Sequence, residues 1–243
     1  MIFHPERMIF FHPGKTAGTA IEYCFGYTHE AYPPGKANFR LFKGWDPVNC
    51  LYLAHATPRF MKARLPAALW NTYLKFTVVR NPYERLVPVY YYQHKQHLRQ
   101  FGSFQNFVAK LPEVLQDKRL YNGSHYIPQY HYAYIDDNKV VDIVLQFESL
   151  DTDFKKICRL LGKPLTLAKV NSATSRQRPK GPIASLYSPD TVRIVQEIYR
   201  KDFECFGYAF DLPSHENVES DDSGQRSCAW IKPVVRARSS YEN

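Results

Sequence analysis

Short apolar runs alternate with helical patterns along most of the chain. Four runs have the length of buried strands: Met8–Phe11, Cys50–Ala54, Tyr73–Val79 and Val140–Phe147. Helical patterns are predicted over about 18–26, 82–99, 104–111, 150–161 and 188–206. Strands that alternate with helices indicate an α/β fold with a central, mostly parallel sheet flanked by helices.

Several predicted helices have recognisable first or last residues. Pro82 suits a first helical turn, and Ser103 and Ser188 precede patterns that they can cap. Gly162 and Gly207 end the patterns that come before them. With 243 residues and 44% apolar content, the chain can bury the core of one domain. We expect this domain over 1–212 and a polar, flexible tail over 213–243.

The first apolar run leads into a loop that suits a phosphate. Pro13 and Gly14 end the run, and the segment Lys15–Thr19 then supplies a cation, two hydroxyls and backbone N–H groups where a helix begins. The loop is not a Walker A motif, because that spacing requires glycine at position 9, which is Ile9. Considered alone, the segment also fits an ordinary strand–turn–helix unit with an incidental lysine.

A second cation stands at the end of a neighbouring strand. Arg80 follows Tyr73–Val79 and precedes the turn Asn81-Pro82. The planar guanidinium can bind two phosphate oxygens at once, although a salt bridge at a strand end would also explain a single arginine. Because parallel strands place their carboxyl ends at one edge of the sheet, both segments together predict a two-part anion site.

The charge of the chain agrees with an anionic ligand. Its net charge is +9 and its isoelectric point is near 9.2. A nucleotide, an acidic glycan or a nucleic acid would suit this charge equally well. We expect no nucleic-acid partner, because no RNA-recognition, zinc-finger or helix-turn-helix signature is present.

These segments resemble a known family. Lys15–Thr19 resembles the 5′-phosphosulfate loop of sulfotransferases that use 3′-phosphoadenosine 5′-phosphosulfate (PAPS), and Val79–Val87 resembles their 3′-phosphate segment. Other segments continue the resemblance in order: Tyr90–Tyr92, Ile127–Tyr130, Val141–Leu150 and Ser188–Tyr208. The pattern is most similar to the Golgi glycan O-sulfotransferase branch, of the heparan and uronyl 2-O type. It implies the P-loop-like fold of that family.

The resemblance implies a donor site for PAPS, with its desulfated form PAP as the product. The residues that would bind this donor are Lys15, Thr16, Ala17, Gly18, Thr19, Ala20, Arg80, Pro88 and Arg176. Thr16 and Thr19 would give hydroxyl donors to the 5′-phosphate. Pro88 departs from the family, which has a serine there that helps to hold the 3′-phosphate. Proline has neither a hydroxyl nor an N–H, so this contact is expected to be weaker or supplied by another residue.

The transfer also requires a base for the acceptor hydroxyl. His55 follows an apolar run, and related 2-O-type enzymes have their catalytic histidine at a matching place before the arginine strand. We predict His55 as general base and Lys15 as the cation that stabilises the leaving group, with no metal involved. A structural role for His55 stays open.

Other polar residues are weaker candidates. His12 could support the loop, and His125 and His131 could line an acceptor site. Glu84 and Arg85 are expected to form a structural ion pair, although Arg85 could also approach the cofactor.

Five scattered cysteines without a C-x-x-C pair favour free thiols in a reducing compartment. No run approaches the roughly 20 apolar residues of a membrane span. Residues 1–13 lack the layout of a signal peptide. We therefore expect a cytoplasmic, bacterial enzyme, or the Golgi lumen if the chain is a truncated eukaryotic form.

Three functions are compatible with the sequence. The first is an O-sulfotransferase that acts on a saccharide or small-molecule hydroxyl. The second is a non-catalytic descendant that binds PAP or a glycan, which Pro88 favours. The third is a small-molecule kinase with a degenerate phosphate loop, which the missing Walker glycine disfavours. The oligomeric state does not follow from the sequence.

Overall fold

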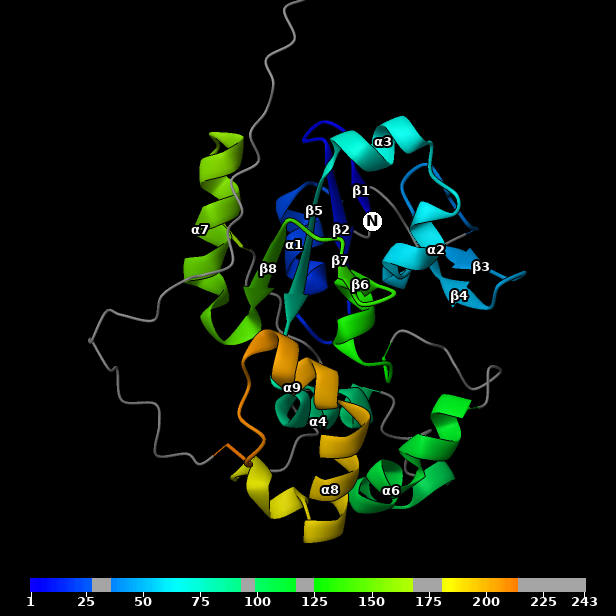
Figure 1. Ribbon diagram of the computed structural model, residues 1–243, viewed down its shortest axis with the longest axis vertical. Coiled ribbons are helices and arrows are strands. Elements are labelled where there is room, and N and C mark those ends of the chain that lie inside the picture. Colours follow the sequence, from blue (N-terminus) through cyan, green and yellow to red (C-terminus); the bar gives the residue numbers. More distant parts are fainter. Residues whose placement is uncertain (28–35, 93–98, 117–124, 168–180, 214–243) are drawn as a thin grey trace, which may run out of the picture.

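The structure, a computed structural model, describes residues 1–27, 36–92, 99–116, 125–167 and 181–213. A four-stranded sheet in the order β1-β2-β5-β8 forms its centre (Figure 1). The strands are β1 (Ile2–Phe3), β2 (Met8–Phe11), β5 (Leu74–Val79) and β8 (Ile143–Gln146). β2, β5 and β8 run parallel, and β1 pairs antiparallel with β2. The predicted α/β architecture with a mostly parallel sheet is confirmed.

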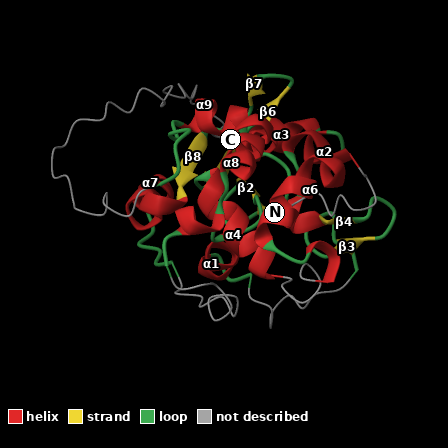
Figure 2. Cartoon of the chain, turned by 90° about the horizontal axis from the view of Figure 1, so that it is seen from below, coloured by secondary structure: helices red, strands yellow, loops and turns green. Residues whose placement is uncertain are grey.

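Helices cover both faces of this sheet, as its apolar strands require. Alternate residues point to opposite faces, so Phe10 packs in one core and Phe11 in the other. The first core includes residues of α1 (Gly18–Cys24) and α7 (Leu150–Leu161). The second includes residues of α2 (Pro58–Lys62) and α3 (Ala67–Thr72), and the view from below shows the strands between the two helical layers (Figure 2).

A layer of helices lies beyond the carboxyl ends of the parallel strands, in the lower half of Figure 1. It consists of α4 (Pro82–Tyr92), α6 (Phe104–Gln116), α8 (Pro189–Ile198) and α9 (Arg200–Phe206). Aromatic side chains dominate its core: Tyr83, Tyr90, Phe104, Phe107, Tyr199 and Phe203. Because α4 packs in this third core through residues such as Tyr83, the core also positions Arg80, which lies between β5 and α4.

The predicted caps Ser103, Ser188 and Gly162 agree with the structure, whereas the helix predicted over 104–111 is longer, because α6 continues to Gln116. The Ser103 hydroxyl accepts the N–H of Asn106 at 3.1 Å, and Ser188 forms a reciprocal cap with Thr191 at the start of α8. Gly162 ends α7 with a φ of 62°, a left-handed conformation that glycine adopts at low cost. The last helix is divided, because α8 ends at Ile198 and α9 begins at Arg200.

The predicted strand Cys50–Ala54 is wrong in part. Only Leu51–Tyr52 (β4) is a strand, and it pairs antiparallel with β3 (Trp45–Asp46) outside the central sheet. The next residues form a short 3₁₀ helix, Leu53–His55. An apolar run of this length fits a buried helical turn as well as a strand, and Leu53 is fully buried here.

Smaller elements connect β5 and β8. They are a 3₁₀ helix at Gln129–Tyr132 and the hairpin of β6 (Tyr134–Ile135) and β7 (Asn138–Lys139). The first part of the helix predicted from Pro82 to Arg99 is α4, which ends at Tyr92. Residues 93–98 of that prediction lie outside the described residues. Pro88 lies inside α4 without ending it, although it supplies no N–H to the helix.

Within the described ranges, no helix is long and apolar enough to cross a membrane. Cys24, Cys50, Cys158 and Cys205 are free thiols. Cys228 and the tail from 214 onward lie outside the described residues, so the flexible tail stays a prediction.

Candidate active site

The loop between β2 and α1 has an unusual backbone. Lys15 and Ala17 adopt positive φ angles of 68° and 64°, which residues other than glycine rarely do. No side chain caps α1, and within the described part of the chain the N–H groups of Lys15, Ala17, Gly18 and Thr19 donate to no acceptor. Left-handed residues between right-handed ones bring successive N–H groups into a concave arrangement that binds anions. The loop therefore has the backbone expected of a phosphate cradle.

Two histidine rings pack directly against the glycines of this loop. A Cβ atom at Gly18 would lie 1.7 Å from Nε2 of His12, and one at Gly14 would lie 2.9 Å from Nδ1 of His125. No side chain larger than hydrogen fits at Gly18 unless His12 moves. The two glycines thus allow His12 and His125 to approach the loop closely.

Lys15 presents a partly buried cation. Its Nζ lies 3.2 Å from the centroid of the Tyr92 ring, a cation–π contact. Burial lowers the pKa of Lys15 to about 8. Within the described residues, no carboxylate lies within ion-pair distance of this ammonium group, so an anionic ligand would supply the missing counter-charge.

The threonine hydroxyls differ in their availability. Thr16 is fully buried and its hydroxyl donates to the carbonyl of Pro13 at 2.8 Å. This bond holds the loop together, so the expectation that the Thr16 hydroxyl faces a phosphate is not met here. Thr19 and Ala20 are half-buried in the first turn of α1. Their orientation toward a ligand stays a prediction.

Arg80 lies directly after β5, and β5 pairs in parallel with β2. The side chain of Gln129 clamps its backbone, accepting the Arg80 N–H at 2.8 Å and donating to the Arg80 carbonyl at 2.7 Å. The Arg80 guanidinium lies 3.4 Å from the Glu84 carboxylate and 4.1 Å from the centroid of the Phe147 ring. The structure thus places Lys15 and Arg80 after adjacent parallel strands, at the same edge of the sheet.

The predicted ion pair between Glu84 and Arg85 is wrong. Glu84 pairs with Arg80, one helical turn away, whereas Arg85 is 1% exposed and donates to backbone carbonyls. Neighbouring residues on a helix point in different directions, so a pair at adjacent positions is not favoured.

His55 lies beside the loop, at the end of its 3₁₀ helix. Its Nδ1 is 2.8 Å from the backbone carbonyl of His12 and must donate to it, because a carbonyl can only accept. Its ring centroid is 4.5 Å from that of His12 and 5.1 Å from that of His125. Burial, followed by the nearby His12, lowers the pKa of His55 to about 3. The imidazole is therefore neutral, with the lone pair on Nε2.

The buried carboxylate of Glu22 contacts the His12 ring. Nδ1 of His12 lies 3.5 Å from the Glu22 carboxylate of α1, and Lys43 Nζ lies 3.5 Å from the same group. Burial alone would raise the pKa of Glu22, but the interactions with His12 and Lys43 outweigh it and lower that pKa. This contact holds the His12 side chain between the loop and His55.

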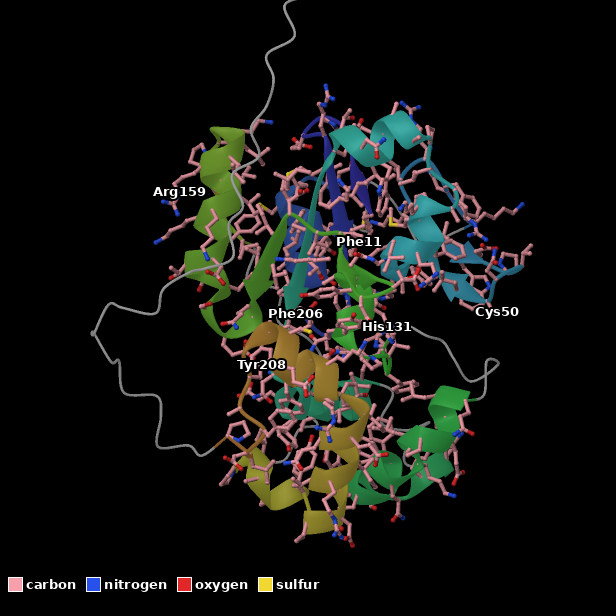
Figure 3. The ribbon with its side chains drawn as sticks, in the orientation of Figure 1. Phe11, Cys50, His131, Arg159, Phe206 and Tyr208 are labelled. Carbon is pink, nitrogen blue, oxygen red and sulfur yellow. The ribbon has the colours of Figure 1, made fainter. Side chains whose placement is uncertain are left out.

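Other predicted residues lie apart from this cluster or outside the described ranges. His131 is exposed and its ring packs against Tyr130, on the 3₁₀ helix below the sheet (Figure 3). Arg176 lies outside the described residues. Pro88 is half-buried in α4, and its relation to a 3′-phosphate stays a prediction. Tyr92 was not predicted as a site residue, and its contacts with Lys15 and His125 give it that place.

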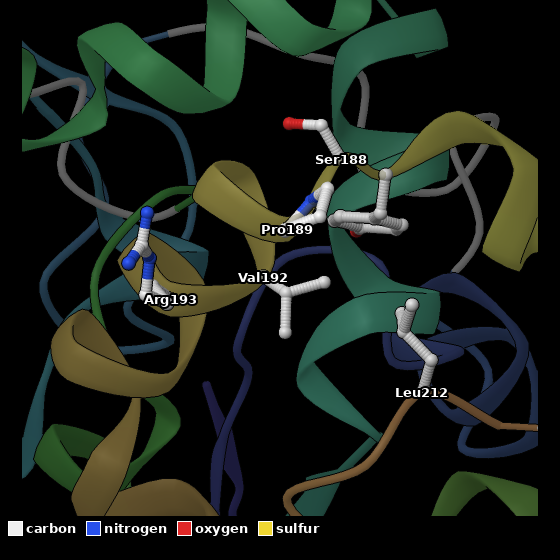
Figure 4. A pocket seen from close by; sticks show the side chains of 6 residues that line it. Ser188, Pro189, Val192, Arg193 and Leu212 are labelled. Carbon is white, nitrogen blue, oxygen red and sulfur yellow. The ribbon is translucent and has the colours of Figure 1, made fainter.

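Two hollows lie elsewhere on the surface. One of about 410 Å³ follows β8 and is lined by Phe147, whose ring faces Arg80. The other, of about 450 Å³, lies at the start of α8, where Arg193 stands at the rim (Figure 4). Arg193 pairs with Asp190 of its own helix, so this second hollow does not share the chemistry of the loop. Among the described residues, no group of three or more metal-ligating side chains is arranged to hold a metal ion.

Comparison with known proteins gives one match. The model of a family described as the sulfotransferase family matches residues 1–209, which is most of the chain. No curated protein and no solved structure matches the chain.

Proposed function

The chain belongs to the sulfotransferase family, and we propose that it moves a sulfuryl group from PAPS to a hydroxyl of a saccharide or small-molecule acceptor. From the order of its motifs we also propose a similarity to the Golgi-type glycan O-sulfotransferases and the P-loop-like fold of that branch. The observation that carries the proposal is the meeting of three groups at one sheet edge. These are the Lys15 loop after β2, Arg80 after β5, and the neutral His55 beside the loop.

The residues present fit a donor with phosphates at two positions. The loop N–H groups that have no acceptor among the described residues, together with the partly buried Lys15, suit a 5′-phosphosulfate. Arg80 suits the 3′-phosphate, which would compete with Glu84 for its guanidinium. The donor supplies an activated sulfuryl group, which an acceptor hydroxyl attacks in line.

Each residue has a defined task in this proposal. His55 accepts the proton of the acceptor hydroxyl at Nε2, because Nδ1 is committed to the carbonyl of His12. The negative charge of a bound donor raises the pKa of His55 from its low value in the free protein. Lys15 and the loop N–H groups stabilise the charge that develops on the phosphate as the sulfuryl group leaves.

The first experiment measures which nucleotide stabilises the folded protein. A ligand at a hundred times its Kd adds about 2.7 kcal/mol, enough for a clear rise in Tm. We expect this rise with 3′,5′-adenosine bisphosphate and not with ADP or Mg-ATP. A larger response to Mg-ATP would favour the kinase, and binding without transfer to any acceptor would favour the non-catalytic descendant.

Replacing Arg80 by alanine is expected to weaken bisphosphate binding by roughly 10- to 100-fold, since charge-assisted hydrogen bonds are lost. The control is Arg193→Ala, which removes an exposed arginine of α8 and should leave binding unchanged. Calorimetric titration of both variants with 3′,5′-adenosine bisphosphate measures the difference. Equal affinity in Arg80→Ala and the unaltered protein would remove Arg80 from the site.

The pH profile of kcat/KM is expected to fall above about pH 8, because Lys15 loses its proton there in the free enzyme. Because the pKa of Lys15 is lowered to about 8, the cation is present below pH 8 and is lost at a lower pH than for an ordinary lysine. Lys15→Arg keeps its charge at all accessible pH values and should remove the alkaline limb, even if its activity is lower. An unchanged limb in Lys15→Arg would assign the titration to another group.

A further inference from the structure

Arg85 is the most deeply buried cation near the candidate active site, and catalysis as proposed above does not use it. It lies on α4, five residues after Arg80, and is 1% exposed. Among the described residues it forms no ion pair with a carboxylate. A guanidinium withdrawn from water in this way is costly unless its N–H groups find acceptors.

Three backbone carbonyls accept those N–H groups. Arg85 Nε donates to Gly14 at 3.1 Å, and Nη2 donates to His125 and Ile127, each at 3.0 Å. Gly14 belongs to the loop after β2, whereas His125 and Ile127 precede the 3₁₀ helix that holds Gln129. One side chain thus connects the loop, the segment beside it and the helix that follows Arg80.

The bond to Gly14 also determines the direction of the next N–H group. In a planar trans peptide the carbonyl and the N–H point in opposite directions. Because the Gly14 carbonyl points at Arg85, the N–H of Lys15 points away from it. That N–H is one of those that donate to no acceptor within the described residues.

The bond to His125 acts on the other side of the loop. It holds the backbone of a residue whose ring packs against Gly14, lies 5.1 Å from the ring of His55 and stacks on Tyr92. Tyr92 in turn contacts the Lys15 ammonium. The Arg85 guanidinium therefore holds both the loop, through Gly14, and the adjacent backbone of His125.

We propose that Arg85 is a positioning residue for the 5′-phosphate: it turns the Gly14–Lys15 peptide so that the Lys15 N–H faces the ligand, and it holds His125 against the loop. This inference rests on the proposed function, since it assumes a ligand with a phosphate in the loop. Arg85 does not touch the ligand itself. Its effect on binding should therefore depend on which phosphate the ligand carries.

The test compares 5′-AMP, 3′-AMP and 3′,5′-adenosine bisphosphate in calorimetric titrations. Arg85→Lys keeps the charge, but its three N–H donors share one nitrogen and cannot reproduce the planar fork in which Nε and Nη2 reach the three carbonyls. We expect it to weaken 5′-AMP and the bisphosphate about tenfold, while the Kd of 3′-AMP changes less than about twofold. A uniform loss for both mononucleotides, or no loss, would overturn the proposal.

Gln129→Met is the matched control, because Gln129 is equally buried and clamps the backbone of Arg80 instead of the loop. It should show the reverse pattern, with weaker 3′-AMP and unchanged 5′-AMP. Both substitutions are expected to lower Tm. If their effects were purely structural, Arg85→Lys and Gln129→Met would therefore change the Kd values of 5′-AMP and 3′-AMP in the same way. If the unaltered protein binds none of the three nucleotides, the proposed function fails before Arg85 is tested.

A measurement on the unaltered protein keeps the proposal falsifiable if Arg85→Lys does not fold. The backbone amide of Lys15 should show one of the largest NMR shift changes on addition of 5′-AMP and little change with 3′-AMP. A Lys15 amide that does not respond to 5′-AMP in a protein that binds it would overturn the positioning role.

Discussion

Lys15→Ala is expected to lower kcat for sulfuryl transfer by roughly 10²- to 10³-fold, the effect of removing a preorganised donor that stabilises developing charge. The ammonium is partly buried and lies over the Tyr92 ring rather than against a carboxylate. Electrostatic stabilisation is stronger in such surroundings than in water. The measurement is transfer of radiolabelled sulfate from PAPS to a panel of hydroxylated acceptors.

The same substitution should not lower stability. The depressed pKa of Lys15 means that the folded protein disfavours the charged form relative to the unfolded chain. Removing the charge therefore relieves a cost, and we expect the Tm of Lys15→Ala in the absence of ligand to stay equal or rise. Activity lost without stability lost is the trade-off expected of a residue kept for function.

Lys62→Ala is the control for Lys15→Ala. Lys62 also lies near an aromatic ring, 5.9 Å from the centroid of Trp70, but it is exposed on α2. Its loss should leave kcat unchanged. If Lys15→Ala kept full turnover under conditions where the unaltered enzyme is active, the loop would not be the site of the leaving phosphate.

Much of the fold could be predicted because its signals are local. Met8–Phe11 is apolar throughout, and Leu74–Val79 is apolar except for the buried Lys75 and Thr77, as expected of strands covered on both faces. Glycine marks the ends of α7 and α9. The hairpin of β3 and β4 could not be predicted in this way. Its strands have two residues each, which is too few for a periodic pattern to reveal them.

The site was predictable where the chemistry follows a strand end, as for Lys15 and Arg80. The role of Arg85 was not, because its three acceptors are backbone carbonyls that no side-chain pattern reveals. A signal was nevertheless present: α4 is apolar around most of its circumference, and a charged residue in such a helix must be buried with partners. The role of Tyr92 could not be predicted either, because Tyr92 and Lys15, which are in contact, lie far apart in the sequence.

His55→Ala is expected to lower kcat by about 10²- to 10⁴-fold, the usual contribution of a general base. The bond from Nδ1 to the His12 carbonyl leaves Nε2 as the basic nitrogen, and the low pKa keeps it unprotonated at neutral pH. The stabilisation by 3′,5′-adenosine bisphosphate should persist in this variant, because the two phosphate-binding segments stay intact. Loss of turnover with retained binding would place His55 in the chemical step.

His55→Asn separates the base from the structural bond. The asparagine amide can still donate to the His12 carbonyl, but it has no basic nitrogen. If the base is essential, His55→Asn should be as inactive as His55→Ala while its Tm lies closer to that of the unaltered protein. His131→Ala, which changes an exposed histidine apart from the loop, should keep full activity. Turnover retained in His55→Ala while Lys15→Ala is inactive would mean that another group accepts the proton, with the neighbouring His12 and His125 as the candidates.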